Sequence, residues 1–192
     1  LTRDDVSLEN MKFRDSRETF VAGVPVILNR ISFSGELGYE VYCHPTYLIR
    51  LAEGLEKVGM DFGYTWYGTR ALMSMRLEKG WGAWGLEYRS DFNVIESRLE
   101  NFINWEKDFI GKEKSIKANQ EIPKRKLVAM SIEGNTIDVS NDEAILHNDR
   151  AIGFVSSGGY GHRVQRSLAL GYVENDFANN RRKLKVEILG KL

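Results

Sequence analysis

Arg70 is the residue whose position most clearly suggests chemistry. It stands at the start of residues 69–79, a segment that predicts a helix, and Gly80 is an ordinary stop signal at its end. The first turn of a helix carries the positive end of the macrodipole, so a cation there costs roughly 0.3–1 kcal/mol. This local cost points to an anionic group opposite Arg70. A solvated surface arginine is the alternative that the segment leaves open.

Glu40 is a second charged residue in a position suited to binding. Residues 24–33 predict a strand, and after a glycine break the apolar alternation continues at the odd positions of residues 39–43. Successive strand side chains point to opposite faces, so Glu40 and Tyr42 lie on the face away from the apolar one. A carboxylate there either meets a ligand or faces solvent, and the strand pattern leaves both open.

The elements that must hold these residues are a mixture of helix and strand. Residues 46–58 predict an amphipathic helix, because apolar side chains recur at three- and four-residue steps. Thr46 is the expected cap at its start, and Gly59 is the expected stop. Further along the chain we predict mostly strand from Asn101 and a short helix over residues 112–119.

The pattern changes to short alternating strands after Lys124. Strands are predicted at residues 127–132, 144–147, 150–155, 168–173 and 184–189. The second and third of these form a hairpin around a tight turn at 148–149. Strands at such short spacing predict a small antiparallel β-barrel. The predicted fold class is therefore α+β, with an α+β region over residues 1–120 and an antiparallel barrel domain over residues 121–192.

The composition excludes several classes of function. The 192 residues carry 27 Lys+Arg against 27 Asp+Glu, so no basic excess indicates binding to nucleic acid. No apolar run approaches the roughly 18 residues of a membrane span. The single cysteine, Cys43, rules out an internal disulfide and fits a reducing compartment, so we expect a cytoplasmic protein. The three histidines are scattered without ligand-like spacing, and we predict no metal site.

Both ends of the sequence suggest a piece of a longer protein. The chain starts at Leu1 rather than at a methionine, and it ends on an apparent strand over residues 183–189. Residues up to about Gly23 are charged and weakly periodic, which fits a linker, an edge element or the end of a missing domain. We therefore expect that part of the natural polypeptide lies outside these 192 residues.

Five motifs together resemble a known family. Residues 35–40 spell Gly-Glu-Leu-Gly-Tyr-Glu, and the helix of residues 68–80 ends in Leu-Glu-Lys-Gly. The other motifs occupy residues 108–113, 153–161 and 167–173. In this order and spacing they resemble the folate-binding aminomethyltransferase family, which includes the T-protein of the glycine cleavage system. The residues of these motifs are closer to those in the C-terminal halves of dimethylglycine and sarcosine dehydrogenases. The resemblance runs from about Arg30 to the C-terminus and implies the fold class given above, with folate bound in the α+β region.

The resemblance also implies roles for four residues. Glu40 falls on the final glutamate of the family's Gly-Glu-x-Gly-x-Glu pattern, a folate contact, and its carboxylate suits the two donors of the pterin's amino-pyrimidone edge. Arg70 falls on the arginine of an Ala-Arg-Asp helix, also a folate contact, although Ala71 replaces the aspartate of the T-protein. Glu96 falls on the glutamate of a Pro-Leu-Glu motif that here lacks its proline, and Tyr160 lies in a glycine-rich turn within reach of the site.

The function implied by the resemblance is tetrahydrofolate-dependent one-carbon transfer. The donor would be a glycine-type methylated amine, the cofactor tetrahydrofolate and the product methylenetetrahydrofolate. Catalytic residues stay unassigned, because the family's assisting aspartate lies in an N-terminal half that this sequence lacks. The expected partners are a methylamine-type substrate and a missing N-terminal or flavin domain of the same protein. Two alternatives stay open: a non-catalytic folate-binding or scaffold domain of a larger flavin-dependent amine dehydrogenase, and a demethylase for a sulfur compound.

Overall fold

The computed structural model describes residues 1–133, 138–178 and 184–189. The chain divides into two compact units, residues 1–72 and residues 73–192, and each is described by itself. Helix α2 (Thr69–Glu78) begins in the first unit and ends in the second. The predicted boundary near Gln120 stays a prediction. In the described ranges, no helix has both the length and the apolar character needed to span a membrane.

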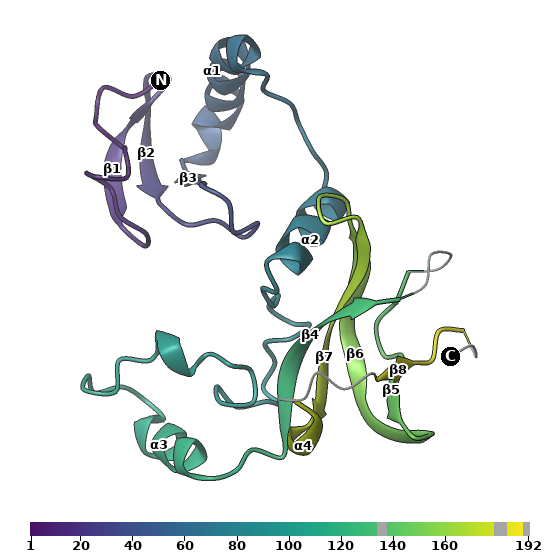
Figure 1. Ribbon diagram of the computed structural model, residues 1–192. Coiled ribbons are helices and arrows are strands. Elements are labelled where there is room, and N and C mark those ends of the chain that lie inside the picture. Colours follow the sequence, from purple (N-terminus) through teal and green to yellow (C-terminus); the bar gives the residue numbers. More distant parts are fainter. Residues whose placement is uncertain (134–137, 179–183, 190–192) are drawn as a thin grey trace. The chain divides into compact units, whose positions relative to one another are not determined.

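The first unit is built on a three-stranded antiparallel sheet (Figure 1). Strands β1 (Ser16–Val21) and β2 (Val24–Asn29) form a hairpin, and β3 (Glu40–Tyr42) pairs with the other side of β2. The turn residues Ala22 and Gly23 both have positive φ, +52° and +74°, as a two-residue hairpin turn requires. Residues before Gly23 therefore include an edge strand, one of the readings that the sequence left open.

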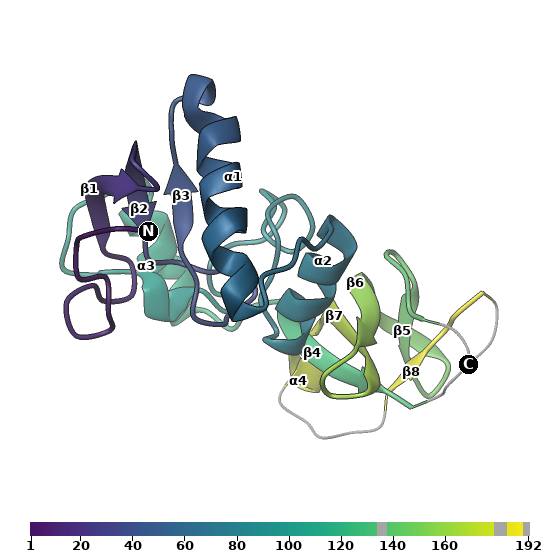
Figure 2. The same cartoon turned by 90° about the horizontal axis from the view of Figure 1, so that it is seen from above.

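Helix α1 (Leu48–Gly59) covers the inner face of this sheet (Figure 2). Leu51 and Leu55 of α1 pack against a buried cluster formed by Met11, Val21, Val24, Val26 and Leu28. Tyr39, Val41 and Cys43 pack at the border of this cluster, so all three strands take part in the core. Gly54 permits the close approach, because a Cβ there would lie 2.5 Å from the Cβ of Ala22. The alternation that the sequence predicted for residues 39–43 therefore places its odd positions on the core side.

The ends of α1 differ from the sequence expectation. The expected cap Thr46 is wrong: the N-cap residue of α1 is Tyr47, and no side chain caps it. His44 caps the short 3₁₀ turn Pro45–Tyr47 that precedes α1, because its Nδ1 accepts a hydrogen bond from the backbone N–H of Thr46 at 3.3 Å. At the other end Gly59 keeps a helical conformation. The helical path continues through Met60–Phe62 and stops at Gly63, where φ is +72°. A glycine alone does not end a helix unless the chain can leave in the left-handed conformation.

The strand predicted from Asn101 is wrong. The chain from residue 81 to residue 111 makes turns, with a 3₁₀ turn at Glu100–Phe102, before helix α3 (Lys112–Gln120). Two asparagines bend it: Asn93 Oδ1 accepts the N–H groups of residues 95 and 96, and Asn104 Oδ1 accepts those of residues 106 and 107. Such side-chain bonds to the local backbone favour turns over a sheet ladder. The short helix predicted over residues 112–119 is confirmed.

The second unit contains a five-stranded antiparallel sheet in the order β4-β7-β6-β5-β8. Its strands are β4 (Arg125–Ile132), β5 (Ala144–His147), β6 (Arg150–Gly161), β7 (Arg166–Glu174) and β8 (Lys185–Val186). A short helix, α4 (Asn175–Ala178), lies between β7 and β8 in the sequence. All five predicted strand regions therefore contain a strand, and the predicted turn of the β5–β6 hairpin has positive φ at Asn148 and Asp149. Within the described residues β4 and β8 do not pair, so the sheet is not a closed barrel there. The mixture of helix and sheet confirms the predicted fold class.

Strand β7, which lies between β4 and β6, is buried on both faces. Leu170 and Tyr172 pack with Leu77 of α2 on one face, whereas Ala169 and Val173 pack with the cluster around β5 and β6 on the other. A strand covered on both sides needs a continuous apolar run rather than an alternating one. Residues 168–173 supply that run.

Candidate functional site

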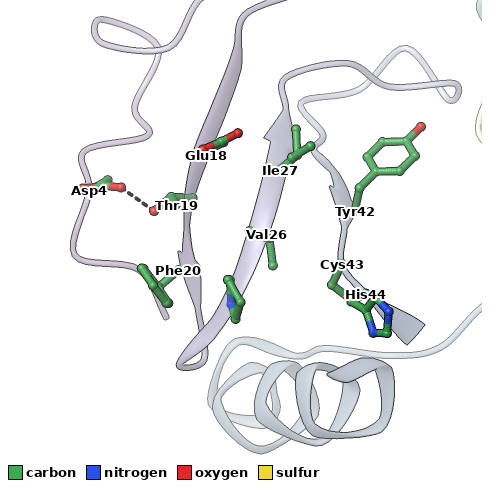
Figure 3. A pocket seen from close by; sticks show the side chains of 10 residues that line it. Asp4, Glu18, Thr19, Phe20, Val26, Ile27, Tyr42, Cys43 and His44 are labelled. Atoms are coloured by element: carbon green, nitrogen blue, oxygen red, sulfur yellow. Dashed lines mark hydrogen bonds between the residues drawn. The ribbon is translucent and has the colours of Figure 1, made fainter. Parts of the chain in front are cut away.

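The outer face of the first sheet, away from α1, carries side chains in ordered rows. Two rows cross all three strands, because the registers of both strand pairs coincide: Ser16, Asn29 and Glu40 form a polar row, and Glu18, Ile27 and Tyr42 form a mixed one. Figure 3 shows Glu18, Ile27 and Tyr42 on their neighbouring strands. Ser16 Oγ donates a hydrogen bond to Asn29 Oδ1 at 2.7 Å. Glu40 therefore ends a polar row that borders an apolar surface.

Glu40 lies on the face that the sequence predicted, partly buried and next to an ordered phenol. The hydroxyl of Tyr42 donates a hydrogen bond to Glu40 Oε2, with 2.6 Å between the two oxygens. This bond and the nearby carboxylate charge raise the pKa of Tyr42 above its ordinary value. The Tyr42 side chain is 55% exposed, so burial does not dictate its position. Sequence reasoning placed Tyr42 on this face but missed its contact with Glu40, which the two-residue spacing permits.

An open cavity of about 820 Å³ adjoins this outer face (Figure 3). Tyr42 and Ile27 contribute to its wall, together with Glu18, Phe20 and His44. The aromatic ring of Tyr42 therefore faces the cavity while its hydroxyl holds the Glu40 carboxylate. Neither Glu40 nor Arg70 is among the residues that line the cavity.

Arg70 is the second residue of α2, belongs to the first unit and is exposed. Its guanidinium forms no hydrogen bond or ion pair with any other residue in the described parts of the chain. The predicted position in the first helical turn is therefore confirmed, and no carboxylate of the described chain offsets the charge there. A pocket shared by Glu40 and Arg70 stays a prediction.

Glu96 lies in the second unit and is 9% exposed. Its Oε2 accepts the N–H of Asn93 at 3.1 Å, while Asn93 Oδ1 accepts the N–H of Glu96 at 3.0 Å, a reciprocal capping arrangement around one turn. Glu96 also lines a cavity of about 640 Å³, together with Phe92, whose ring is stacked on that of Tyr172. The local structure therefore gives Glu96 a capping role, and its assignment as a folate contact stays a prediction.

Tyr160, the fourth predicted site residue, lies on β6 in the second unit and is 40% exposed. Its backbone carbonyl accepts a hydrogen bond from Ser74 Oγ at 2.6 Å, which ties α2 to the sheet. Its ring stands edge-on to the ring of His162, with 5.2 Å between the centroids. Tyr160 and Glu96 do not line a common cavity among the two described above.

A buried ion pair in the second unit escaped the sequence reasoning. Glu87 is fully buried, and its Oε2 accepts from Arg76 Nη1 at 2.9 Å and from the N–H of Ala83 at 2.7 Å. The two serine hydroxyls of Ser156 and Ser157 donate to its Oε1. A bulge in β6 turns both adjacent serines toward the same carboxylate. No local sequence pattern predicts that the two serines contact Glu87, because 69 and 70 residues separate them from it.

A second glutamate of this unit, Glu78 of α2, caps a backbone turn. The guanidinium of Arg76 is directed to Glu87 rather than to Glu78. Glu78 Oε1 accepts the N–H groups of Arg163 at 2.7 Å and Val164 at 3.2 Å. Both glutamates hold the second unit together.

Comparison with protein families identifies both parts of the sequence. Residues 1–107 match the family described as "GCVT N-terminal domain". Residues 125–192 match the "Glycine cleavage T-protein C-terminal barrel domain". The first match alone covers more than half of the chain, and the two matches follow each other in the order that the sequence motifs predicted.

Individual relatives agree with these matches. The mitochondrial dimethylglycine dehydrogenase of Homo sapiens is 37% identical over 195 residues, a region that includes all of this chain and 22% of that enzyme. An aminomethyltransferase of Thermoanaerobacter sp. (strain X514) is 28% identical over 97% of this chain and 51% of its own length. The crystal structure of the glycine cleavage system aminomethyltransferase T from Bartonella henselae superposes with a TM-score of 0.84 and 25% identity, over 95% of this chain and 50% of that one. The chain thus spans about a fifth to a half of the length of these relatives.

Proposed function

Because this chain belongs to the glycine cleavage T-protein family, we propose that it takes part in tetrahydrofolate-dependent one-carbon transfer from a glycine-type methylated amine. The observation that carries the proposal is the Glu40 carboxylate, which stands on the outer face of the first sheet with the Tyr42 hydroxyl fixing one oxygen. The names of the relatives support the same chemistry: they include aminomethyltransferases and dimethylglycine dehydrogenases.

The donor set of this face suits a reduced pterin. An amino-pyrimidone edge offers an exocyclic amino group beside a ring N–H, and both can donate to one carboxylate. Each carboxylate oxygen has two acceptor positions, so Glu40 Oε2 can accept a ligand N–H in addition to the Tyr42 hydroxyl. Beside the carboxylate, Ile27 and Tyr42 provide an apolar and aromatic surface next to which a flat ring can lie. The residues present therefore fit the pterin.

Arg70 would supply the complementary donor. Its guanidinium has no acceptor among the described residues and stands in the first helical turn, where a positive charge is locally unfavourable. An acceptor of the ligand, such as the pterin oxygen or a carboxylate of the folate tail, would offset that cost. Under this proposal Glu40 accepts and Arg70 donates.

The chain's own contribution to the reaction would be binding and orientation. Glu40 and Arg70 would hold the ring so that its reactive nitrogen meets the one-carbon unit, and proximity of this kind supplies a large share of a transfer reaction's acceleration. Tetrahydrofolate, when bound, supplies the nucleophilic N5 that accepts the one-carbon unit. Glu96 and Tyr160 stay proposed folate contacts of the second unit, and no residue of this chain is assigned a proton-transfer role.

The dehydrogenase branch of the family is the better supported of the alternatives. The human dimethylglycine dehydrogenase shares 37% identity with this chain, against 28% for the Thermoanaerobacter aminomethyltransferase. Because the chain corresponds to 22% of that dehydrogenase, we propose that its partners are a methylamine-type substrate and a further domain of a longer polypeptide. The cytoplasmic location stays a proposal that rests on the single Cys43.

Titration of the chain with (6S)-tetrahydrofolate by isothermal calorimetry tests the proposal. We expect Glu40→Gln to weaken binding by roughly 1.5–3 kcal/mol, the range of a hydrogen bond to a charged group, and Arg70→Ala to weaken it comparably. Glu18→Gln is the matched control, because Glu18 is an exposed carboxylate on the same sheet face and in the neighbouring row. Thermal melts should show all three variants folded. Equal affinity in the wild type, Glu40→Gln and Arg70→Ala would refute the proposal.

A further inference from the structure

Tyr42 is poorly explained as a packing residue. More than half of its side chain is exposed, and it lies on the face of the sheet opposite the core. Its ring contributes to the wall of the open cavity, and the hydroxyl's hydrogen bond in the described structure is the one to Glu40. A phenylalanine would fill the same space, so the hydroxyl is the part of the side chain that needs an explanation.

The hydrogen bond to Glu40 is of the strong, charge-assisted type. The 2.6 Å distance between the Tyr42 hydroxyl and Glu40 Oε2 lies in the range of an O–H donor to a carboxylate. The effect on the phenol is consistent, because the bond to Glu40 is the largest cause that raises the pKa of Tyr42. A contact this short restricts the rotation of the carboxylate about its last bond.

The register of the sheet makes this contact possible. Glu40 is opposite Asn29, and Tyr42 is opposite Ile27, so both side chains project from β3 on the outer face, two residues apart. Their Cα atoms are then separated by about 7 Å along the strand, a span that a tyrosine side chain bridges. The hydroxyl reaches the carboxylate from one side, and the described residues leave Oε1 and the second acceptor position of Oε2 unoccupied.

We propose that Tyr42 is a positioning residue that sets the orientation of the Glu40 carboxylate for bidentate recognition of the pterin edge; this inference rests on the function proposed above. A glutamate side chain has several rotatable bonds, and a ligand that must order them loses affinity. Tyr42 restricts these rotations before the ligand arrives. The hydroxyl of Tyr42 acts through Glu40 and makes no ligand contact that the argument requires.

Tyr42→Phe tests the inference, because it removes the hydroxyl and keeps the ring. We expect (6S)-tetrahydrofolate to bind this variant about fivefold more weakly, the net effect of one hydrogen bond, with an unchanged melting temperature. In a Glu40→Gln background the same substitution should have no further effect. Tyr47→Phe is the matched control, since Tyr47 is an exposed tyrosine of the same unit without a described hydroxyl bond. It should bind like the wild type.

A second measurement reports directly on the hydrogen bond between Tyr42 and Glu40. In protein labelled at the tyrosine Cζ, nuclear magnetic resonance should show a raised pKa for Tyr42 that falls back toward the ordinary value in Glu40→Gln. If Tyr42→Phe binds folate like the wild type while Glu40→Gln binds weakly, the inference is wrong and the proposed function stands. If both bind like the wild type, the proposed function fails as well. If Tyr42→Phe weakens binding equally in the Glu40→Gln background, Tyr42 acts directly on the ligand, which also overturns the inference.

Discussion

Replacing Glu87 with glutamine removes one charge from the interior of the second unit and leaves the shape unchanged. The carboxylate is 0% exposed, and the guanidinium of its partner Arg76 is 1% exposed. Arg76 Nη1 also donates to the carbonyl of Trp81 at 3.1 Å, while its Nε is buried without a hydrogen-bond partner among the described residues. Glu87 is therefore the counter-charge of Arg76, and without it a buried cation stands alone.

The expected loss follows from that geometry. Breaking a buried ion pair by removing one partner typically costs about 3–5 kcal/mol, because the remaining charge is left without compensation in a poorly polarisable interior. A domain of this size has a total stability of about 5–15 kcal/mol, so Glu87→Gln should remove a large fraction of it. The amide oxygen of the new glutamine can still accept from Arg76 and Ala83, and the two serine hydroxyls can turn to accept from its NH2 group, which places the loss toward the lower end of that range.

Urea unfolding followed by tryptophan fluorescence measures the effect, because the carbonyl of Trp81 is held by Arg76 and its ring reports on the same region. The control is Glu174→Gln, which breaks the exposed bidentate pair with Arg150 and should shift the unfolding midpoint far less, since solvent screens that pair. Arg76→Met combined with Glu87→Gln should cost less than the sum of the two single substitutions. Equal midpoints for Glu87→Gln and Glu174→Gln would show that the buried pair does not stabilise the unit.

Two further outcomes follow from single contacts. Burial raises the pKa of Tyr172 to about 12, so its protonated hydroxyl contributes stability that is complete below the unfolded value near 10 and is lost as the pH rises through about 12. Urea midpoints between pH 9 and pH 12 should therefore fall more steeply in the wild type than in Tyr172→Phe, and parallel curves would contradict this. Gly54→Ala should destabilise the first unit although alanine favours helix, because the new Cβ would lie 2.5 Å from that of Ala22. A higher melting temperature of this variant would show that α1 is free to move away.

The sequence was most informative where local signals agreed with one another. The hairpin of β5 and β6 was predictable, since alternating strands flank a two-residue Asn–Asp turn whose residues tolerate positive φ. Strand β1 was not, because only Thr19 and Val21 are buried in it and the exposed Phe20 interrupts the alternation. The predicted strand from Asn101 failed for the opposite reason: its apolar residues suggested a ladder, but asparagine side chains capture the backbone in turns.

The residues of the candidate site also differ in whether the sequence could predict their positions. Its near neighbours in sequence were accessible to pattern reasoning: the face of Glu40 follows from a period of two, and the place of Arg70 follows from the start of a helix. The partners of Glu87 were not accessible, because the two serines reach it from a bulge about 70 residues further along the chain. A bulge changes the side-chain period locally, and only the three-dimensional register shows where it falls.

The orientation of Glu40 depends less on its own contacts than on the burial of its neighbours. Strand β3 has only three residues and pairs with β2 alone in the described sheet, so hydrogen bonds by themselves define its register weakly. Tyr39 and Val41 pack on the core, and a slip by one residue would bring Glu40 to the core side and expose both of them. The loss of apolar burial opposes that slip. The carboxylate on which the proposed folate contact depends is therefore kept on the outer face by the hydrophobic residues on either side of it.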